Sequence, residues 1–304
     1  MRVTMLAAVF AAAALATAAP AVAEADWPAV ESVLGRGAAV QPDGVRRFGF
    51  PRTDLRVRLD GVELRPALAL GSWLAFAEHG GAATVMGDLV LTQEEANPVL
   101  RRLLEGGLTA TALHNHLLRS EPATVYMHVH GHGDALALAR ALRGAREASR
   151  TPLGATAAAA PAAPAGPGLD TAALDRALGA SGRVNGGVYR AVIPRAERIT
   201  EDGMETPATL GTGMAINVQP LAEGRVAATG DLVLLAPEVG GVEQALASHG
   251  IGVTALHSHT LGEEPRLFYM HFWAVGPAKA VAEGLRAALD RTNVRHAAAG
   301  GGRG

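Results

Sequence analysis

Leu113-His114-Asn115-His116, followed by Glu121-Pro122 and Tyr126-Met127-His128, is a stretch that this chain contains twice. The second copy reads Leu256-His257-Ser258-His259, Glu264-Pro265 and Tyr269-Met270-His271. Every histidine and glutamate of the first copy precedes its counterpart by the same 143 positions. Equal spacing over three separate blocks indicates an internal duplication, so fold and site are both expected in two copies.

Apolar periodicity and turn residues predict the same order of elements in each copy. In the first copy we expect helices at residues 27–35, 92–105 and 134–146, and strands at 45–52, 73–77, 83–91 and 125–130. In the second copy we expect helices at 170–179, 237–248 and 277–290, and strands at 188–195, 214–219, 225–235 and 267–274. A further strand in each copy carries the histidine pair. The expected fold is α+β, with two homologous repeats that are each a mainly antiparallel sheet with two to three helices, packed as a pseudo-dimer.

The chain is expected to divide into five segments. Its 304 residues, 49% of them hydrophobic, are enough for two ordinary domains with real cores. Residues 1–23 read as a secretory signal peptide, because Arg2 precedes an apolar run that ends at Ala21-Val22-Ala23. The others are a first repeat domain at 24–150, an Ala/Pro/Gly linker at 151–168, a second repeat domain at 169–295 and a flexible tail at 296–304. We therefore expect an exported protein, either periplasmic or extracellular.

Composition excludes several kinds of partner. The formal net charge is −2 and no basic run occurs, so the sequence has no footprint for nucleic acid or for an anionic membrane surface. No transmembrane span is expected in the mature chain, because prolines interrupt the apolar run at 151–168. The absence of cysteine excludes disulfides and thiolate ligands. A metal ion would therefore have to be held by His, Asp or Glu.

The repeated histidines predict a metal site in each copy. Residues i and i+2 of a strand point to one face, so His114 and His116 are expected side by side, and His128 returns to them across a short hairpin loop. Three neutral imidazoles that converge suit zinc or another borderline divalent ion. The predicted ligands are His114, His116 and His128 in the first copy, and His257, His259 and His271 in the second. The alternatives are a metal-free polar network or small-ligand pocket, and surface histidines that meet by coincidence.

Glu121 and Glu264 lie in the loop between the histidine strands of their copies. Each is a candidate fourth ligand, or a general base that acts on a metal-bound water. A simple turn residue beside proline is the competing interpretation.

Asp88 and Asp231 each follow a glycine at equivalent positions of the two copies. A bulge or turn at that glycine with a solvent-facing aspartate is favoured over a carboxylate that faces the histidines. Tyr126 and Tyr269 are expected to pack in the core, or else to reach the site with their hydroxyl groups.

Four arginines also recur at the offset of 143, and solvated positions on a strand face are favoured for them over an anion clamp beside the site. They are Arg47, Arg52, Arg190 and Arg195. His130 and His132 continue the i, i+2 series of His128 in the first copy only. They are either a second, weaker metal site or solvated histidines at a strand edge.

The spacing H-x-H-x4-E resembles the first cupin motif, but the second cupin motif is missing and the helices do not suit a small β-barrel. The blocks Ala112-Leu113-His114-Asn115-His116, Glu121-Pro122 and Phe268-Tyr269-Met270-His271-Phe272-Trp273 resemble more closely the LppY/LpqO family of uncharacterised exported bacterial proteins. The resemblance covers residues 35–291 and implies paired domains and the location of the site. It implies no reaction, because that family has no established activity, and this chain lacks the lipobox cysteine.

Three functions are compatible with this sequence. The first is an exported protein with two similar histidine sites that bind a divalent metal, zinc being the favoured ion. The second is a metal-dependent hydrolase with Glu121 or Glu264 as general base, and the third is a non-catalytic envelope interaction or small-ligand-binding module. No nucleophile elbow, phosphate loop or dinucleotide fingerprint favours another enzyme class, and the sequence leaves open whether the protein is an enzyme.

The signal peptide leads to a prediction about processing. The mature chain should begin near Glu24, because the apolar run ends in a small-residue cleavage site just before it. Intact-mass measurement of protein recovered from the export fraction tests this. A mass that retains residues 1–23 would contradict export by this route.

Overall fold

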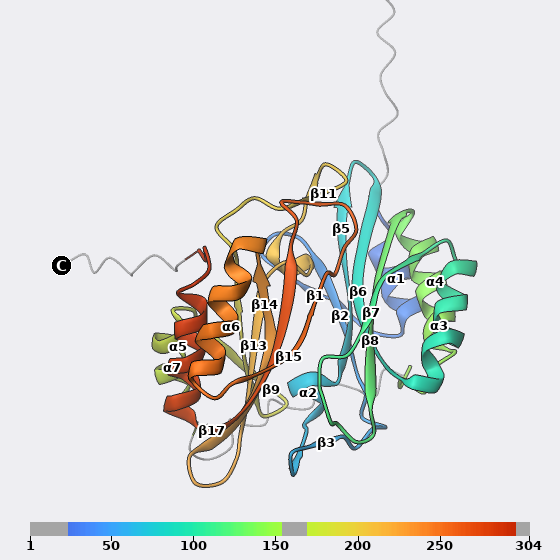
Figure 1. Cartoon of the computed structure of the whole chain (residues 1–304). Coiled ribbons are helices and arrows are strands. Elements are labelled where there is room, and N and C mark those ends of the chain that lie inside the picture. Colours follow the sequence, from blue (N-terminus) through green and yellow to red (C-terminus); the bar gives the residue numbers. More distant parts are fainter. Residues whose placement is uncertain (1–23, 154–168, 296–304) are drawn as a thin grey trace, which may run out of the picture.

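The computed structural model describes residues 24–153 and 169–295, which form four layers, helices–sheet–sheet–helices (Figure 1). The two sheets face each other in the middle, and each carries its helices on its outer side. The predicted signal peptide, most of the predicted linker and the predicted tail lie outside the described residues. The predicted α+β pair of repeats is confirmed.

The first half builds a six-stranded antiparallel sheet in the order β1-β2-β5-β6-β8-β7. Its strands are β1 (Ala39–Val40), β2 (Arg46–Pro51), β5 (Gly71–His79), β6 (Ala82–Thr92), β7 (Thr109–His114) and β8 (Thr124–Gly133). Its helices are α1 (Trp27–Leu34), α3 (Gln93–Glu105) and α4 (Ala135–Arg146). Between β2 and β5 lie β3 (Arg58–Leu59), β4 (Val62–Glu63) and the short α2 (Pro66–Ala69).

The second half repeats this order as β9-β10-β13-β14-β17-β15. Its strands are β9 (Arg183–Asn185), β10 (Val188–Ile193), β13 (Met214–Pro220), β14 (Arg225–Leu234), β15 (Gly252–His257) and β17 (Phe268–Pro277). Its helices are α5 (Thr171–Leu178), α6 (Val239–Ser248) and α7 (Ala278–Leu289). The smaller elements are β11 (Thr200–Glu201), β12 (Met204–Glu205), β16 (Glu263–Glu264), and the 3-10 turns η1 (Ala208–Leu210) and η2 (Ala236–Glu238). None of the helices in these two ranges is long and apolar enough to cross a membrane.

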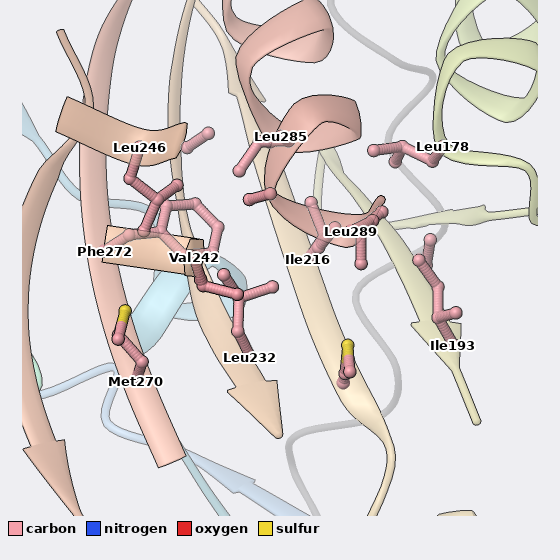
Figure 2. Close-up of a cluster of buried hydrophobic side chains, with 14 of the residues drawn as sticks. Leu178, Ile193, Ile216, Leu232, Val242, Leu246, Met270, Phe272, Leu285 and Leu289 are labelled. Carbon is pink, nitrogen blue, oxygen red and sulfur yellow. The ribbon is translucent and has the colours of Figure 1, made fainter. Parts of the chain in front are cut away.

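Strand alternation sends one set of side chains to the helices and the other set to the opposite sheet. In the second half, Met270 and Phe272 of β17 pack with Leu246 of α6 and Leu285 of α7 in a buried apolar cluster (Figure 2). The first half has an equivalent cluster between its sheet and α1, α3 and α4. The polar residues of the same strands, including His271, therefore point away from these cores toward the other half.

The helices begin and end where the sequence predicts. Asp134 and Asp170 accept hydrogen bonds from the first-turn amides of α4 and α5, and Gly35 ends α1 in a left-handed conformation that glycine adopts without strain. Thr92 and Glu95 form a capping box at the start of α3.

Arg52 and Arg195 are buried structural residues, so the expectation of solvated positions was wrong for them. The Arg52 guanidinium bonds to Asp54, to Glu95 and to the carbonyl of Val90. Arg195 makes the same three kinds of contact with its own half, to Glu197, Glu238 and the carbonyl of Val233. Arg52 thus ties the end of β2 to β6 and to the start of α3, and Arg195 ties the end of β10 to β14 and to the residue before α6. Neither can clamp an anion at the site.

The two sheets are joined by apolar and polar contacts. One apolar cluster contains Leu68 and Tyr126 of the first half together with Val188 and Trp273 of the second. The Thr111 hydroxyl donates to the carbonyl of His259 at 2.5 Å, and its counterpart Thr254 donates to the carbonyl of His116 at 2.6 Å. This reciprocal pair shows that the halves are related by a pseudo-twofold axis through the region between them.

Removing Arg52 should destabilise the fold strongly. In Arg52→Met, Glu95 keeps its burial but loses its cation, a change that costs roughly 3–5 kcal/mol of unfolding free energy. Arg102→Met is the matched control, because Arg102 pairs with Glu105 at the surface, where loss of a pair costs less than about 1 kcal/mol. Guanidinium denaturation of both variants measures the difference. Equal stability of the two would show that the buried pair is dispensable.

Candidate metal centre

The six predicted ligand histidines lie on the inner faces of the two sheets. His128 on β8 is opposite Ala112 of β7 and Asp88 of β6, so it returns to the first pair as predicted. His114 is the last residue of β7, and His116 lies just beyond it, with ring centroids 4.9 Å apart. His257, His259 and His271 have equivalent places on and beside β15 and β17.

The structure brings both triads into one cluster, where two separate sites were expected. Each ring stacks on a ring of the other half, with centroid distances of 3.5 Å for His114 and His257, 3.7 Å for His116 and His271, and 3.6 Å for His128 and His259. We call these six residues the histidine cluster. The sequence could not show this arrangement, because equal spacing of two copies does not reveal whether their sites face each other.

Asp88 and Asp231 join the histidine cluster, so the prediction of solvent-facing aspartates beside a bulge was wrong. The register of β6 runs without interruption through Gly87 and Asp88, and the Asp88 side chain is only 7% exposed. Asp88 Oδ2 lies 3.7 Å from His116 Nε2, and Asp231 Oδ1 lies 2.6 Å from His271 Nδ1. The recurring Gly-Asp pair in the sequence was the signal that pointed to these carboxylates.

Four groups of side chains place their ligand atoms within 4.8 Å of one another. Two groups are equivalent under the duplication, and each belongs to one half: Asp88 with His116 and His128, and Asp231 with His259 and His271. The other two join the halves: His114, His116, His257 and His271, and His114, His128 and His259. Two histidines with one carboxylate form a known ligand set for divalent ions and leave coordination positions open.

His257 and His271 face each other with their Nε2 atoms 2.8 Å apart. The other nitrogen of each ring lies 3.1 Å from a backbone carbonyl, that of Ser258 for His257 and that of Gly230 for His271. The His271 Nδ1 also lies 2.6 Å from Asp231 Oδ1. The two Nε2 atoms are close enough to share one proton, or to ligate one cation when neither of them carries a hydrogen.

Several other ring nitrogens of the histidine cluster are buried without a hydrogen-bond partner in the described part of the chain. They are Nδ1 and Nε2 of His114 and Nε2 of His116, His128 and His259. An unpaired buried polar atom costs about 1–3 kcal/mol. So many in one place are not explained by packing, and they are the atoms that would ligate a metal.

Five of the six histidines are held neutral at pH 7, as ligation requires. Burial, followed by the charges of neighbouring histidines, lowers the pKa of His114 to about 2 and that of His257 to about 4. The same causes lower the pKa values of His116, His128 and His259 well below 6.5.

The two carboxylates respond differently to their surroundings. Burial, and then the charge of Asp231, raises the pKa of Asp88 well above its usual range. Burial acts on Asp231 in the same direction, but the charge of His271 helps to outweigh it, and the pKa of Asp231 is lowered. A cation bound beside Asp88 would favour its ionised form, because the cation would offset the effects of burial and of the Asp231 charge.

Glu121 and Glu264 are not brought to the histidine cluster. Both side chains are exposed, and neither belongs to the four groups with metal-ligand spacing. Glu121 bonds through its backbone to Arg58, and Glu264 pairs through its backbone with Thr200 of β11. Both are thus backbone-paired residues outside the ligand groups, Glu121 in an isolated β-bridge and Glu264 in β16.

The remaining candidates lie around the histidine cluster. The Tyr126 ring stacks on His116 at 3.6 Å, and the Tyr269 ring stacks on His259 at 3.3 Å, so the tyrosines pack against the ligand rings. His132 is exposed and bonds to Thr84. Neither His130 nor His132 occurs in a metal-ligand group of the described residues.

A pocket reaches the histidine cluster from one side. Its lining includes Asp88, His116, Asp231 and His271, together with Arg190 of β10. Two further polar residues of this lining are not among the predicted site residues. Asn217 and Thr229 lie on β13 and β14 and have no counterpart of the same type in the first half, so the repeat pattern did not mark them.

Comparisons with solved structures show little similarity. PduB, a trimeric bacterial microcompartment shell protein, aligns over 85% of this chain and 91% of its own at 11% identity, with a TM-score of 0.22. EtuB from Clostridium kluyveri aligns over 84% of this chain and 89% of its own at 10% identity, with a TM-score of 0.20. Scores this low carry no argument about fold or function. No curated protein matches the chain in sequence.

A protein family, in contrast, matches both halves. The family is described as "Domain of Unknown Function (DUF1259)", and it matches residues 28–148 and again residues 172–291. The two matches contain the histidine triads at equivalent positions. Because together they cover most of the chain, the protein is a tandem-duplicated member of this family of unknown function.

Proposed function

We propose that this protein binds divalent metal ions between its two sheets. The single observation that carries the proposal is the set of buried ring nitrogens without a hydrogen-bond partner in the described part of the chain, Nε2 of His116, His128 and His259, which lie within ligand spacing of Asp88 or Asp231. Each half contributes one Asp-His-His triad, which is Asp88 with His116 and His128 in the first half and Asp231 with His259 and His271 in the second. The rings of His114 and His257 stack on each other. Two ions per chain, one for each triad, correspond best to the pseudo-twofold symmetry.

The donor atoms favour a borderline ion. Imidazole nitrogen suits zinc, copper, nickel and iron, whereas carboxylate oxygen alone would favour magnesium or calcium. Zinc is the first candidate, because its tetrahedral shell can be completed by water once three protein ligands are in place. An accessible water position would leave room for a small molecule next to the ion.

Export is the second part of the proposal. The apolar run that ends at Ala21-Val22-Ala23 supports a periplasmic or extracellular location, as does the resemblance of the histidine blocks to the LppY/LpqO family. Outside the cytoplasm, cysteine ligands are exposed to oxidation. A metal site built from histidine and aspartate avoids that oxidation and therefore suits an exported protein.

The two competing functions find less support. A hydrolase that uses Glu121 or Glu264 as base would need a carboxylate beside the metal, and both glutamates are exposed outside the ligand groups. A binding module with purely structural histidines would leave the unpaired ring nitrogens without an explanation.

Metal content should follow the triads. Elemental analysis of wild type reloaded with zinc after chelation should give about two ions per chain, since two triads are present. His116→Ala and His259→Ala should each lose about one ion, and the double variant should lose both. His79→Ala is the matched control, because His79 is exposed on β5 and should leave the content unchanged. Wild type that takes up no zinc, copper or manganese would refute the proposal.

Acid should destabilise the metal-free protein. An unfolded histidine takes up a proton near pH 6.5, whereas folded His257 does so only near pH 4 and folded His114 near pH 2. Between these values the unfolded chain binds more protons, so the free energy of unfolding falls as pH falls, by up to about 1.4 kcal/mol per unit for each such histidine.

Urea denaturation at several pH values between 4 and 7 measures this slope. His257→Gln should reduce the slope of unfolding free energy against pH near pH 5 by about 1.4 kcal/mol per pH unit. The reason is that the variant removes one histidine that is protonated at this pH only in the unfolded chain. His79→Gln should leave the slope as in wild type. A slope that His257→Gln does not change would show that His257 is not held neutral in the fold.

A further inference from the structure

The two inner sheet faces are not identical beside the aspartates. Trp73 is opposite Asp88 in the first half, and Ala215 holds the same register opposite Asp231 in the second. One pair further along, Ala75 is opposite Met86, and Asn217 is opposite Thr229. A large ring and a thioether in one half thus correspond to small or polar side chains in the other.

This difference changes the surroundings of the two equivalent arginines. The Arg47 guanidinium lies 4.1 Å from the centre of the Trp73 ring and donates to the carbonyl of Thr209 at 2.7 Å, so it is half-buried and occupied. Arg190 has Ala215 where Arg47 has the tryptophan. Its side chain is exposed, and its one side-chain hydrogen bond in the described part of the chain, to Asn217 Oδ1, is long at 3.4 Å.

Arg190 also lines the pocket that contains Asp88, His116, Asp231 and His271. Its apolar lining includes Leu68 and Trp73. A guanidinium thus shares one pocket with residues of the candidate metal groups, so one small molecule in it can contact both. The open edge of a guanidinium accepts a carboxylate or phosphate in two-point contact.

We infer that this pocket binds a small oxyanion, a carboxylate or a phosphate, with Arg190 holding its charge and with the metal centre at its other end. The inference rests on the proposed metal site, because unneutralised Asp88 and Asp231 would repel an anion. The occupant must be small, because the pocket has a volume of about 90 Å³. Only one such pocket is expected per chain, since Trp73 fills the equivalent space beside Arg47.

Isothermal titration calorimetry of the zinc-loaded full chain tests this, with inorganic phosphate and benzoate as separate probes. Wild type should bind at least one of them at about one per chain. Arg190→Gln should weaken that binding at least tenfold, because the charged two-point contact is lost. Arg183→Gln, at an exposed arginine of the neighbouring strand β9, should bind like wild type. Binding of phosphate alone would assign the pocket to phosphates, and binding of benzoate alone to carboxylates.

Ala215→Trp is a second variant that leaves Arg190 in place and gives the second half the tryptophan of the first. It should lose anion binding and keep its zinc. Zinc content is measured in every sample, so a chain that takes up no zinc fails the proposed function and this inference with it. Two outcomes overturn the inference alone. One is zinc-loaded wild type that binds neither probe, and the other is a zinc-loaded Arg190→Gln variant that binds as tightly as wild type.

Discussion

The fold depends on the burial of two polar sheet faces against each other. Each sheet presents histidines and an aspartate on the side away from its helices, and imidazole or carboxylate groups buried without partners are costly. When the two halves pack face to face, the histidines and aspartates of both sheets leave water together and gather in one cluster. The reciprocal bonds from Thr111 and Thr254 to the carbonyls of His259 and His116 fix this arrangement, because each half holds the loop that carries a histidine of the other.

Local patterns were enough to predict the elements of each half. Helix caps such as Asp134 and Asp170 and the constant offset of 143 located the helices and strands, and the short loop after His116 returned His128 to its pair. The relation between the halves was less predictable. Whether the His114 ring contacts only His116 of its own half or also His257 of the other half depends on how the two halves pack about the pseudo-twofold axis. The spacing of residues along the chain does not reveal that packing.

Residues of one type took different roles, and their neighbours explain why. Arg52 is buried because Glu95 and the Val90 carbonyl complete its hydrogen bonds, whereas Arg47 is covered by Trp73, and Arg190 is exposed beside Ala215. Asp88 was misjudged for a similar reason. Glycine before aspartate is typical of turns, but here Gly87 lies in a central strand, where a Cβ would meet Leu74 and the Trp73 carbonyl at 2.6 Å. The glycine is needed for close packing and lets the next residue face inward.

Fusion of the two copies into one chain gives a freedom that a homodimer lacks. In a symmetric dimer, every change on an inner face appears twice, so a tryptophan beside one arginine would cover both. Here Trp73 covers Arg47 while its counterpart Ala215 leaves Arg190 open, and His130 corresponds to Trp273, whose indole donates to Asp60 of the other half at 3.1 Å. The six histidines and two aspartates occupy equivalent positions in the two halves, whereas the β5 and β13 residues paired with the aspartates, and the next pair on the same face, differ. In the proposed anion site, that difference decides which of the two arginines is open to the small molecule.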